Sequence, residues 1–444
     1  MDSSEVVAAA TQAYIYGYPL CYNLDEIAKL PDGESTIFDN TPVPWNRFAP
    51  VRELLDPSAA FVSPNNDTLY LMAPLDLSAG PLVLHVPDTH DRYYVLQFVD
   101  AWTNNFAYIG RRATGTAEAD YLLVPAGYTG DVPVEMTAVE VPSTVAVIVG
   151  RVAVNGESDL PAVHDLQDQF TLRPLDANQG PLDGIPTPDP GVSQELAFWE
   201  QLRVSIAAFP PPEADTAFMG LLETLGVVGA ASSLSDPDPQ LAAALATGLQ
   251  QGRAMIDKLA GGSNDNKRWS TAKHMFDYNL DRLGLGTLHS PDWLIADRKT
   301  AYVTRAVIAR AGLWGNNGYE ANYDFAWVDA DGDPLDGTKS YEVTFSPPPP
   351  VQAFWSLTMY DTPRFYLVAN PINRYSIGDR TPGLVYGEDG SVTLYLQHEP
   401  PTADKQPNWL PTPAGPFRPV LRSYQPDQSI LDDSYQLPEI RRLP

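Results

Sequence analysis

Residues 93–100 read Tyr-Tyr-Val-Leu-Gln-Phe-Val-Asp. Aromatic and β-branched residues dominate this run, which favours a strand. Residues 354–361 read Phe-Trp-Ser-Leu-Thr-Met-Tyr-Asp, a second aromatic run that ends in Asp. Two strands of one type, far apart in the chain, indicate a duplicated architecture, although such strands are common in β-sandwiches. The sequence therefore predicts a β module in each half of the chain.

Other short apolar runs extend this pattern in both halves. Gly, Pro and Asp cluster between them, and 43 prolines and 31 glycines without a collagen-like period are typical of turn-rich β proteins. This texture favours antiparallel sandwiches. The further predicted strands are 69–72, 82–86 and 144–149 in the first half, and 341–345, 352–360 and 391–397 in the second.

Helical patterns lie outside these runs, with apolar residues recurring every three or four positions. The predicted helices are 3–29, 195–208, 240–259 and 297–311. We therefore predict a mainly β fold with a helical insert, in which two β-sandwich or jelly-roll-like modules are joined by an α-helical region. The expected divisions are an N-terminal helix and lead-in (1–60), a first sandwich (61–155), a helical bridge (156–312) and a second sandwich (313–444).

The chain of 444 residues carries a formal net charge of −28, from 56 acidic and 28 basic residues. Long-range repulsion of phosphate groups argues against nucleic acid or an anionic lipid surface as a partner. A single cysteine, Cys21, excludes a disulfide within the chain and a zinc site built from several of its thiolates. No run of about 18 apolar residues occurs, so we expect no membrane span. A homo-oligomer stays possible.

One stretch resembles a calcium loop, because Asp329, Asp331 and Asp333 alternate along it. The sixth position of such a loop would be Pro334 instead of Gly, and the twelfth would be Ser340 instead of Glu. We therefore interpret the stretch as a hairpin turn.

Other standard motifs are missing. The six histidines never fall at the i, i+2 or i, i+4 spacings that place two imidazoles on one face for a metal, although a site assembled from distant residues stays open. No Gly-x-Ser-x-Gly elbow, phosphate loop or dinucleotide fingerprint occurs. We predict no cofactor and no metal site from local spacing.

Candidate catalytic residues lie in two segments, 63–70 and 100–110, where strands are expected to begin or end. Asp67 and Asp100 would supply a carboxylate pair for acid and base roles, with Tyr70 as a hydroxyl donor. The structural alternative is that Asn65, Asn66 and Asp67 cap a turn, which is what Asn and Asp do most often in loops.

Candidate binding residues are amides, aromatics and one arginine. In a third segment, 370–380, Arg374 and Arg380 flank Asp379, which suits either a carboxylate ligand or internal ion pairs. The aromatic side chains could line an apolar cavity with hydroxyl donors, or they could pack in the core. The predicted substrate-binding set is Tyr14, Tyr16, Asn65, Asn66, Trp102, Asn104, Asn105, Tyr108, Arg374 and Tyr375, with Trp314 and Tyr319 as further cavity aromatics.

These segments make the chain recognisable, because it resembles bacterial proteins that pair domain-of-unknown-function family 1254, N-terminal, with family 1214, C-terminal. The resemblance implies two β-sandwich or jelly-roll modules joined through helices, and it brings no reaction with it. Many such relatives look exported. This N-terminus shows no basic segment followed by an apolar one, so we expect a cytoplasmic protein as given, or an exported one if a leader was removed. The motifs that carry the resemblance are 13–19, 64–70, 91–94, 103–110, 353–356, 370–378, 408–411 and 415–417.

Our leading functional hypothesis is an enzyme that processes a small molecule by hydrolase- or lyase-like acid–base chemistry in a cavity lined by Tyr, Trp, Asn and Asp. A second hypothesis is a carbohydrate- or metabolite-binding protein without catalysis, since Trp and Tyr on sandwiches stack on apolar ring faces. A third is a metal-dependent enzyme with scattered ligands. The expected partner in each case is a small molecule.

Overall fold

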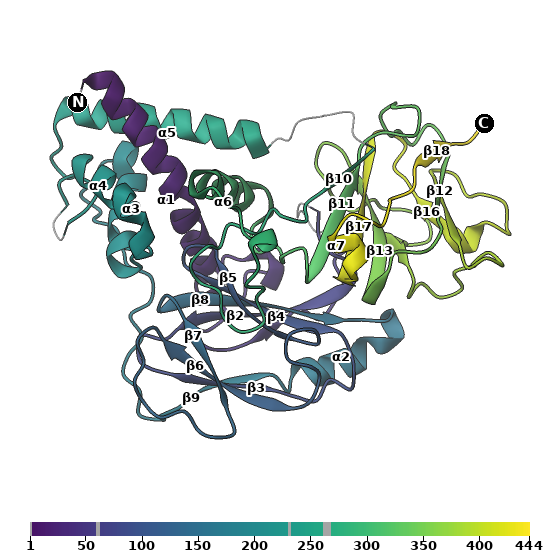
Figure 1. Cartoon of the computed structure of the whole chain (residues 1–444), viewed down its shortest axis with the longest axis horizontal. Helices are drawn as coiled ribbons and strands as arrows, with labels where there is room; N and C mark the ends of the chain where they lie inside the picture. The colour runs from purple at the N-terminus through teal and green to yellow at the C-terminus, as the bar shows by residue number, and fades with distance from the viewer. Residues whose placement is uncertain (1, 59–62, 230–231, 261–267) are drawn as a thin grey trace.

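The computed structural model describes residues 2–58, 63–229, 232–260 and 268–444 of the chain. It consists of two β modules and a helical region (Figure 1). The predicted modules joined through helices are therefore confirmed. The helical region is larger than a mainly β description suggests, because one helix alone, α1, spans Ser3–Asp32.

The first module is a sandwich of two sheets around a core of Leu, Val, Ile and Phe side chains. β6 and β7 run parallel, and the other pairs are antiparallel. The five-stranded sheet has the order β1 (Ala49–Pro50), β2 (Thr68–Asp76), β8 (Val145–Ala153), β4 (Tyr94–Asp100), β5 (Asn105–Gly110). The four-stranded sheet has the order β7 (Thr137–Val141), β6 (Ala119–Pro125), β3 (Leu82–Val86), β9 (Thr171–Pro174).

The second module is also a sandwich, with its own apolar core. Its parallel pair is β15 and β16. The five-stranded sheet has the order β10 (Trp269–Thr271), β11 (Ala321–Ala326), β17 (Phe417–Pro426), β13 (Val351–Asp361), β14 (Ser376–Gly378). The four-stranded sheet has the order β16 (Trp409–Pro411), β15 (Val392–Gln397), β12 (Tyr341–Phe345), β18 (Ile440–Arg442).

The two modules have the same strand order. Adding nine to each strand number of the first module gives the order of the second in both sheets, and the parallel pair occupies the same place. The aromatic runs 93–100 and 354–361 belong to β4 and β13, which hold equivalent places. The duplicated architecture indicated by these two runs therefore covers every strand of both modules.

The helices pack beside the first module and cover part of its five-stranded sheet (Figure 1). α1 begins with a capping box, in which Asp2 accepts from the backbone of Glu5 while the Glu5 side chain accepts from the backbone of Asp2. None of the helices in the described ranges is long and apolar enough to cross a bilayer. The other helices are α2 (Leu160–Gln167), α3 (Ala197–Ala208), α4 (Thr216–Thr224), α5 (Pro239–Ala260), α6 (Arg298–Gly312) and α7 (Gln428–Leu431).

The module limits differ from the predicted ones. The strands of the first module run from Ala49 to Pro174, beyond the predicted 61–155, because the short strands β1 and β9 carry no strong strand pattern. The predicted start at residue 61 lies outside the described residues. β10 of the second module falls within the predicted helical bridge and is separated from β11 by α6.

Candidate functional site

The two modules meet at what we call the seam. On its first side are the segment 63–70 and the outer face of β8 and β4, and on its second side is the outer face of the β11–β17–β13 sheet. In Figure 1 this sheet is the layer of the second module that lies nearer to the first. Hydrogen bonds cross the seam from both sides, so the two modules are joined by polar contacts as well as by aromatic packing.

Each side of the seam presents a tyrosine paired with an arginine on the neighbouring strand. Tyr70 of β2 is directly opposite Arg151 of β8, and Tyr323 of β11 is directly opposite Arg422 of β17. Because β2 corresponds to β11 and β8 to β17, the two pairs occupy equivalent places in the duplicated fold. Residues that are directly opposite share a face of the sheet, so each arginine lies beside its tyrosine. The guanidinium group of Arg151 lies 5.4 Å from the ring centre of Tyr70.

A carboxylate precedes each tyrosine by three residues. The Oδ2 atom of Asp67 accepts hydrogen bonds from the hydroxyls of Ser356 (2.7 Å) and Tyr424 (3.0 Å) across the seam. The Oε1 atom of Glu320 accepts from the hydroxyl of Tyr93 at 3.1 Å, again across the seam. Burial raises the pKa of Tyr93 and of Tyr424 well above the usual value, so both phenols are protonated donors at neutral pH.

Two arginines complete this set of equivalent contacts. The Nε atom of Arg112 donates to Oε2 of Glu320 at 2.7 Å, and Nη2 of Arg380 donates to the backbone oxygen of Asp67 at 3.1 Å. Burial raises the pKa of Glu320, an effect that the Arg112 ion pair opposes. Asp67 thus lies at the centre of the seam, with both modules contributing to its surroundings.

A cleft opens between the modules next to these residues. Its volume is about 610 Å³, within the range of small-molecule sites. Tyr93 and Phe354 line it, and the guanidinium group of Arg380 lies 3.4 Å from the ring centre of Phe354. Since Arg380 also donates to the backbone oxygen of Asp67, one side chain joins the wall of the cleft to the backbone of the segment that carries the seam carboxylate.

A chain of amides fixes Arg151 in place. Its Nη1 donates to Oε1 of Gln97 at 2.8 Å, and Nε2 of Gln97 donates to Oδ1 of Asn105 at 2.7 Å. Asn105 and Tyr108 then donate to Oδ1 of Asn317. Asn105 and Tyr108, both predicted to bind substrate, therefore act through buried structural hydrogen bonds that orient Arg151.

Asp100 does not join Asp67. Leu69, two residues after Asp67, is level with Tyr94 across β8, whereas Asp100 is level with Leu75 at the other end of the sheet. Six strand residues span about 20 Å, so the predicted carboxylate pair does not form. β2 and β4 both run antiparallel to β8, so they start at the same end of the sheet. Asp67 precedes the start of β2, whereas Asp100 is the last residue of β4, at the opposite end.

The Asp100 carboxylate is instead part of a buried turn. It accepts hydrogen bonds from the backbone and the side chain of Asn104, both at 2.9 Å, and Asn104 in turn accepts from Arg305 of α6. Burial raises the pKa of Asp100. The predicted binding role of Asn104 gives way to this structural one, because its amide groups bond to Asp100 and Arg305.

The predicted binding residue Tyr16 belongs to a buried cluster around Asp215 in the helical region. The Tyr16 hydroxyl donates to Oδ2 of Asp215 at 2.8 Å, and the Tyr302 hydroxyl and Arg298 donate to Oδ1. The ring of Tyr16 also contacts that of Trp102, whose Nε1 donates to a backbone oxygen. Tyr16 and Trp102 are thus core residues.

The remaining predicted binding residues are spread over the molecule. Tyr14 packs between α1, α3 and α5. Arg374 donates to three backbone oxygens of residues 406–409, so it is held by neutral acceptors and not by the internal ion pairs weighed against a ligand role. Asn65 caps the turn before β2, and Asn66 bonds to a backbone oxygen, as the structural alternative holds. Tyr375 lies at the seam with Phe325 and Phe365.

The predicted aromatic cavity is likewise divided. Trp314 shares the helical core with Tyr14, Tyr16 and Trp102, while Tyr108 and Tyr319 pack in the cluster between the modules.

Residues 329–337 form a turn, in which the Asp329 carboxylate accepts hydrogen bonds from the backbone of Asp331 and Asp333. Within the described ranges, no group of three or more His, Cys, Asp or Glu side chains could hold a metal ion.

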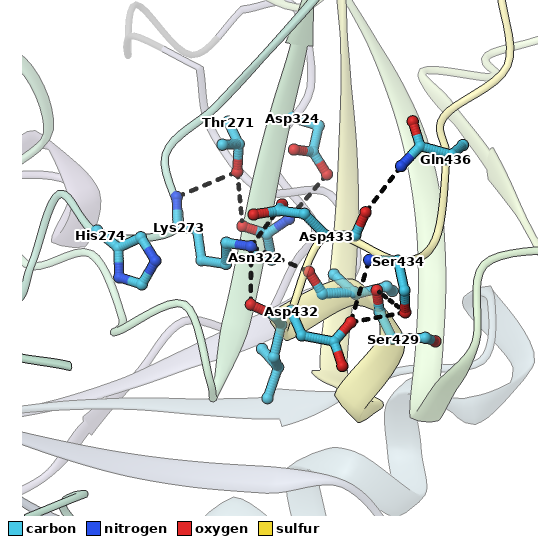
Figure 2. A network of polar contacts seen from close by, with 12 residues as sticks. Thr271, Lys273, His274, Asn322, Asp324, Ser429, Asp432, Asp433, Ser434 and Gln436 are labelled. Carbon is cyan, nitrogen blue, oxygen red and sulfur yellow. Dashed lines mark hydrogen bonds and ion pairs between the residues drawn. The ribbon is translucent and has the colours of Figure 1, made fainter. Parts of the chain in front are cut away.

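A separate polar network ties α7 to the second module (Figure 2). The ammonium of Lys273, which is 2% exposed, donates to the backbone oxygens of Ile430 and Leu431 and to Asp433. Backbone oxygens at a helix C-terminus favour a cation. Next to it, Asp324 accepts from Asn322, and burial raises the pKa of Asp324 to about 6.

Replacing Asp324 by Asn is expected to remove part of the pH dependence of stability. The folded pKa of about 6 exceeds the ordinary carboxyl value of 3.8, so the wild type loses stability as pH rises from about 4 to about 6. The loss is at most about 3 kcal/mol. Urea unfolding of both proteins at pH 4, 5, 6 and 7 measures the difference. Parallel curves for wild type and Asp324→Asn would contradict the shifted pKa.

In each module, a row of directly opposite residues runs across the five-stranded sheet from the seam arginine to a glycine on the last strand. Gly110 is opposite Val95, which is opposite Arg151, and Gly378 is opposite Ser356, which is opposite Arg422. A Cβ on Gly110 would lie 2.6 Å from the backbone oxygen of Tyr94, and one on Gly378 would lie 2.0 Å from that of Trp355. Neither position has room for a side chain.

Substituting Ala for Gly110 or Gly378 is expected to destabilise the protein by about 1–3 kcal/mol, because backbone must shift to admit the methyl group. Gly378→Ala should cost more, since its contact is closer. Urea unfolding midpoints measure both. Gly312→Ala is the control, because no atom lies within 4 Å of its Cβ, and it should leave the midpoint nearly unchanged. Equal midpoints for all three variants would refute the close approach.

Sequence reasoning missed most of the seam. Arg151 interrupts the apolar run Val145–Ala153, and Arg422 lies within β17. A charged residue inside a buried strand is rare without a partner, so these arginines carried a usable signal. Tyr424 and Ser356 carried none, because their spacing is that of ordinary strand residues.

Two family models match the chain. The model described as "Protein of unknown function (DUF1254)" matches residues 45–174, and that described as "Protein of unknown function (DUF1214)" matches residues 320–428. The first match encloses β1 to β9, and the second covers β11 to β17. The resemblance to these two families, in this order, is confirmed.

One solved structure shares the fold, and a second shows a weaker likeness. The VPA0106 protein of Vibrio parahaemolyticus is 27% identical, with a TM-score of 0.73 over 99% of this chain and 100% of that one. An uncharacterised protein from Burkholderia cenocepacia is 12% identical, with a TM-score of 0.42 over 100% of this chain and 95% of that one. No curated protein matches the sequence.

Proposed function

We propose that this chain, which carries a DUF1254 region followed by a DUF1214 region, is an enzyme that processes a small molecule by acid–base chemistry at the seam. Asp67 is the proton acceptor and donor, and phenol hydroxyls are the neutral donors around it. The reaction class is hydrolysis or elimination, in which a proton moves to Asp67 and a leaving group takes one from a phenol or water.

One observation carries this proposal. The buried Asp67 carboxylate, 4% exposed, comes from the first module and is held by the Ser356 and Tyr424 hydroxyls of the second. Within the described residues, only Oδ2 accepts hydrogen bonds, which leaves Oδ1 for a substrate. Two hydroxyl bonds fix the direction of the carboxylate without neutralising it, as an acid–base group requires.

Tyr70 is the proposed hydroxyl donor, as it was from the sequence. It is three residues after Asp67 on β2, is only partly buried, and lies against Arg151. Tyr70 therefore supplies the donor role, and Asp100 has no part in the proposed reaction.

The test is turnover by wild type and by Asp67→Asn. Both proteins are incubated with a defined panel of esters, lactones and hydroxy acids, and mass spectrometry measures the consumption of each compound. The proposal expects at least one compound that wild type consumes and Asp67→Asn does not. Asp76→Asn, at the other end of the same strand, is the control, because its carboxylate accepts only from backbone N–H groups of a turn and a neighbouring loop.

Two other outcomes favour the alternatives. Compounds that bind and are recovered unchanged after long incubation favour a carbohydrate- or metabolite-binding protein. Turnover that a chelator abolishes and that elemental analysis links to a bound metal favours the metal-dependent enzyme. Equal turnover by wild type and Asp67→Asn contradicts the proposed role of Asp67.

A further inference from the structure

Four arginines at the seam have no carboxylate partner. Arg151, Arg380, Arg418 and Arg422 make no ion pair within 4 Å among the residues that the structure describes. Asp67 of the seam has no cationic partner within that distance either. The seam therefore carries an excess of buried positive charge.

Arg151 and Arg422 are the most deeply placed of the four, with 7% and 3% of their surface exposed. Arg151 donates to Gln97 and to the backbone of Trp314. Arg422 donates to Thr358 and to the backbone of Ser63, and its Nε has no partner. These acceptors are all neutral. Burying a charge is costly unless an opposite charge or a full set of hydrogen bonds offsets it.

This arrangement runs against the composition of the chain. Acidic residues outnumber basic ones by 56 to 28, so a carboxylate partner was available for almost any arginine. Internal ion pairs do hold the neighbouring Arg92 and Arg112. Arg305 and Arg374, elsewhere in the fold, also donate to neutral acceptors. The seam differs because four such arginines lie together there, which is the pattern of a site that receives its anion from outside.

We propose that the seam binds a small organic carboxylate, held by Arg151 and Arg422 from the two sides of the seam. This inference rests on the proposed function, because the carboxylate would be the substrate or product of the reaction at Asp67. The equivalent Tyr–Arg pairs present one guanidinium from each module. Guanidinium groups match the planar geometry of a carboxylate and bind it with two parallel hydrogen bonds.

The remaining lining suits an apolar body on this ligand. Tyr70, Tyr323 and Phe325 are only partly buried, although their neighbours along the strands are enclosed. Phe325 and Tyr375 belong to an apolar cluster at the same face. Partly buried aromatic rings beside a buried cation can contact the ring or short hydrocarbon chain of a ligand, while the ligand's carboxylate neutralises the cation.

The test measures the thermal stability of the full chain with named probes at constant ionic strength. Benzoate, phenylacetate and succinate are the carboxylates, benzamide is the uncharged control, and inorganic phosphate tests a different oxyanion. At least one carboxylate is expected to raise Tm by about 2–4 °C at saturating concentration, and benzamide should not.

Arginine variants then locate the site. Arg151→Gln and Arg422→Gln are expected to weaken carboxylate binding by about 10–100-fold in isothermal titration. Arg305→Gln is the matched control, because Arg305 is also 7% exposed but lies on α6 beside Asn104, at the other end of the sheet. It should keep full binding. If the Gln variants fold poorly, Arg422→Lys retains the charge but loses the planar fork, and is expected to bind with intermediate affinity.

The outcomes separate this inference from the proposed function. No stabilisation by any of the three carboxylates, equal effects of benzoate and benzamide, or an effect of phosphate alone would each overturn it. Equal loss in Arg422→Gln and Arg305→Gln would overturn it too. Carboxylate binding that persists while Asp67→Asn retains full turnover contradicts the proposed function alone, whereas Asp67-dependent turnover without carboxylate binding contradicts the anion site alone.

Discussion

Replacing Asp67 by asparagine is expected to lower kcat by about 10²–10⁴-fold on any substrate that the panel identifies, with a smaller change in KM. The asparagine amide has nearly the shape of the carboxylate and can still accept from the hydroxyls of Ser356 and Tyr424. It cannot accept a proton at neutral pH. Steady-state kinetics of wild type and Asp67→Asn measure the difference, with Asp76→Asn as the control at the other end of β2.

Two further variants distinguish an acid–base role from a structural one. Tyr424→Phe and Ser356→Ala each remove one hydrogen bond to Asp67 and leave the carboxylate in place. Each variant leaves the carboxylate less firmly oriented, so kcat should fall by less than in Asp67→Asn, with little change in KM. An unchanged kcat in both variants would contradict the role of the two hydroxyls in orienting the Asp67 carboxylate.

Replacing Asp215 by alanine is expected to destabilise the helical region by about 3–5 kcal/mol. The Asp215 carboxylate is 2% exposed and accepts from Tyr16, Tyr302 and Arg298, so its removal leaves two buried phenols and a guanidinium without this acceptor. The measurement is the urea midpoint of helix unfolding by circular dichroism. Because the chain has several modules, the transition must be followed by a probe of the helices rather than as one two-state step.

The comparison with Tyr16→Phe makes this prediction specific. That variant removes one hydroxyl and leaves Asp215 with its other donors, so its cost is expected to be about 1 kcal/mol. Asp215→Asn, which keeps an acceptor but loses the charge that pairs with Arg298, should fall between the two. Equal midpoints for Asp215→Ala and Tyr16→Phe would show that the cluster contributes little to stability.

The fold was predictable where the local pattern was strong. The predicted helix 3–29 is α1, and the predicted strands 82–86 and 341–345 are β3 and β12. The longest omission is β17, Phe417–Pro426, which contains two prolines and two arginines. These residues weaken a strand pattern, yet β17 lies inside its sheet because both neighbours, β11 and β13, pair with it.

The site was less predictable, because its residues come together through register. Asp67 and Asp100 have the same sequence pattern, because both are polar residues where a strand begins or ends. Only the strand directions show that they lie at opposite ends of the strands of one sheet. Three predicted binding residues are core residues instead: Asn104, Trp102 and Tyr16. Buried amides and aromatics have the same sequence pattern as the lining of a cavity, so the sequence could not separate the two cases. Tyr70 and Asp67 stay near each other in the chain, because Asp67 directly precedes β2 and Tyr70 is its third residue.

The duplicated strand order has a consequence for how the seam arose. Contacts across it come in matched pairs, with Arg112 on Glu320 and Arg380 on Asp67, while Tyr93 and Phe354 occupy equivalent places and pack on each other. This is the arrangement of an isologous dimer around a two-fold axis. A tandem chain holds both copies at high effective concentration. Each half of such an interface is free to carry its own side chain, as Asp67 and Glu320 show at equivalent places.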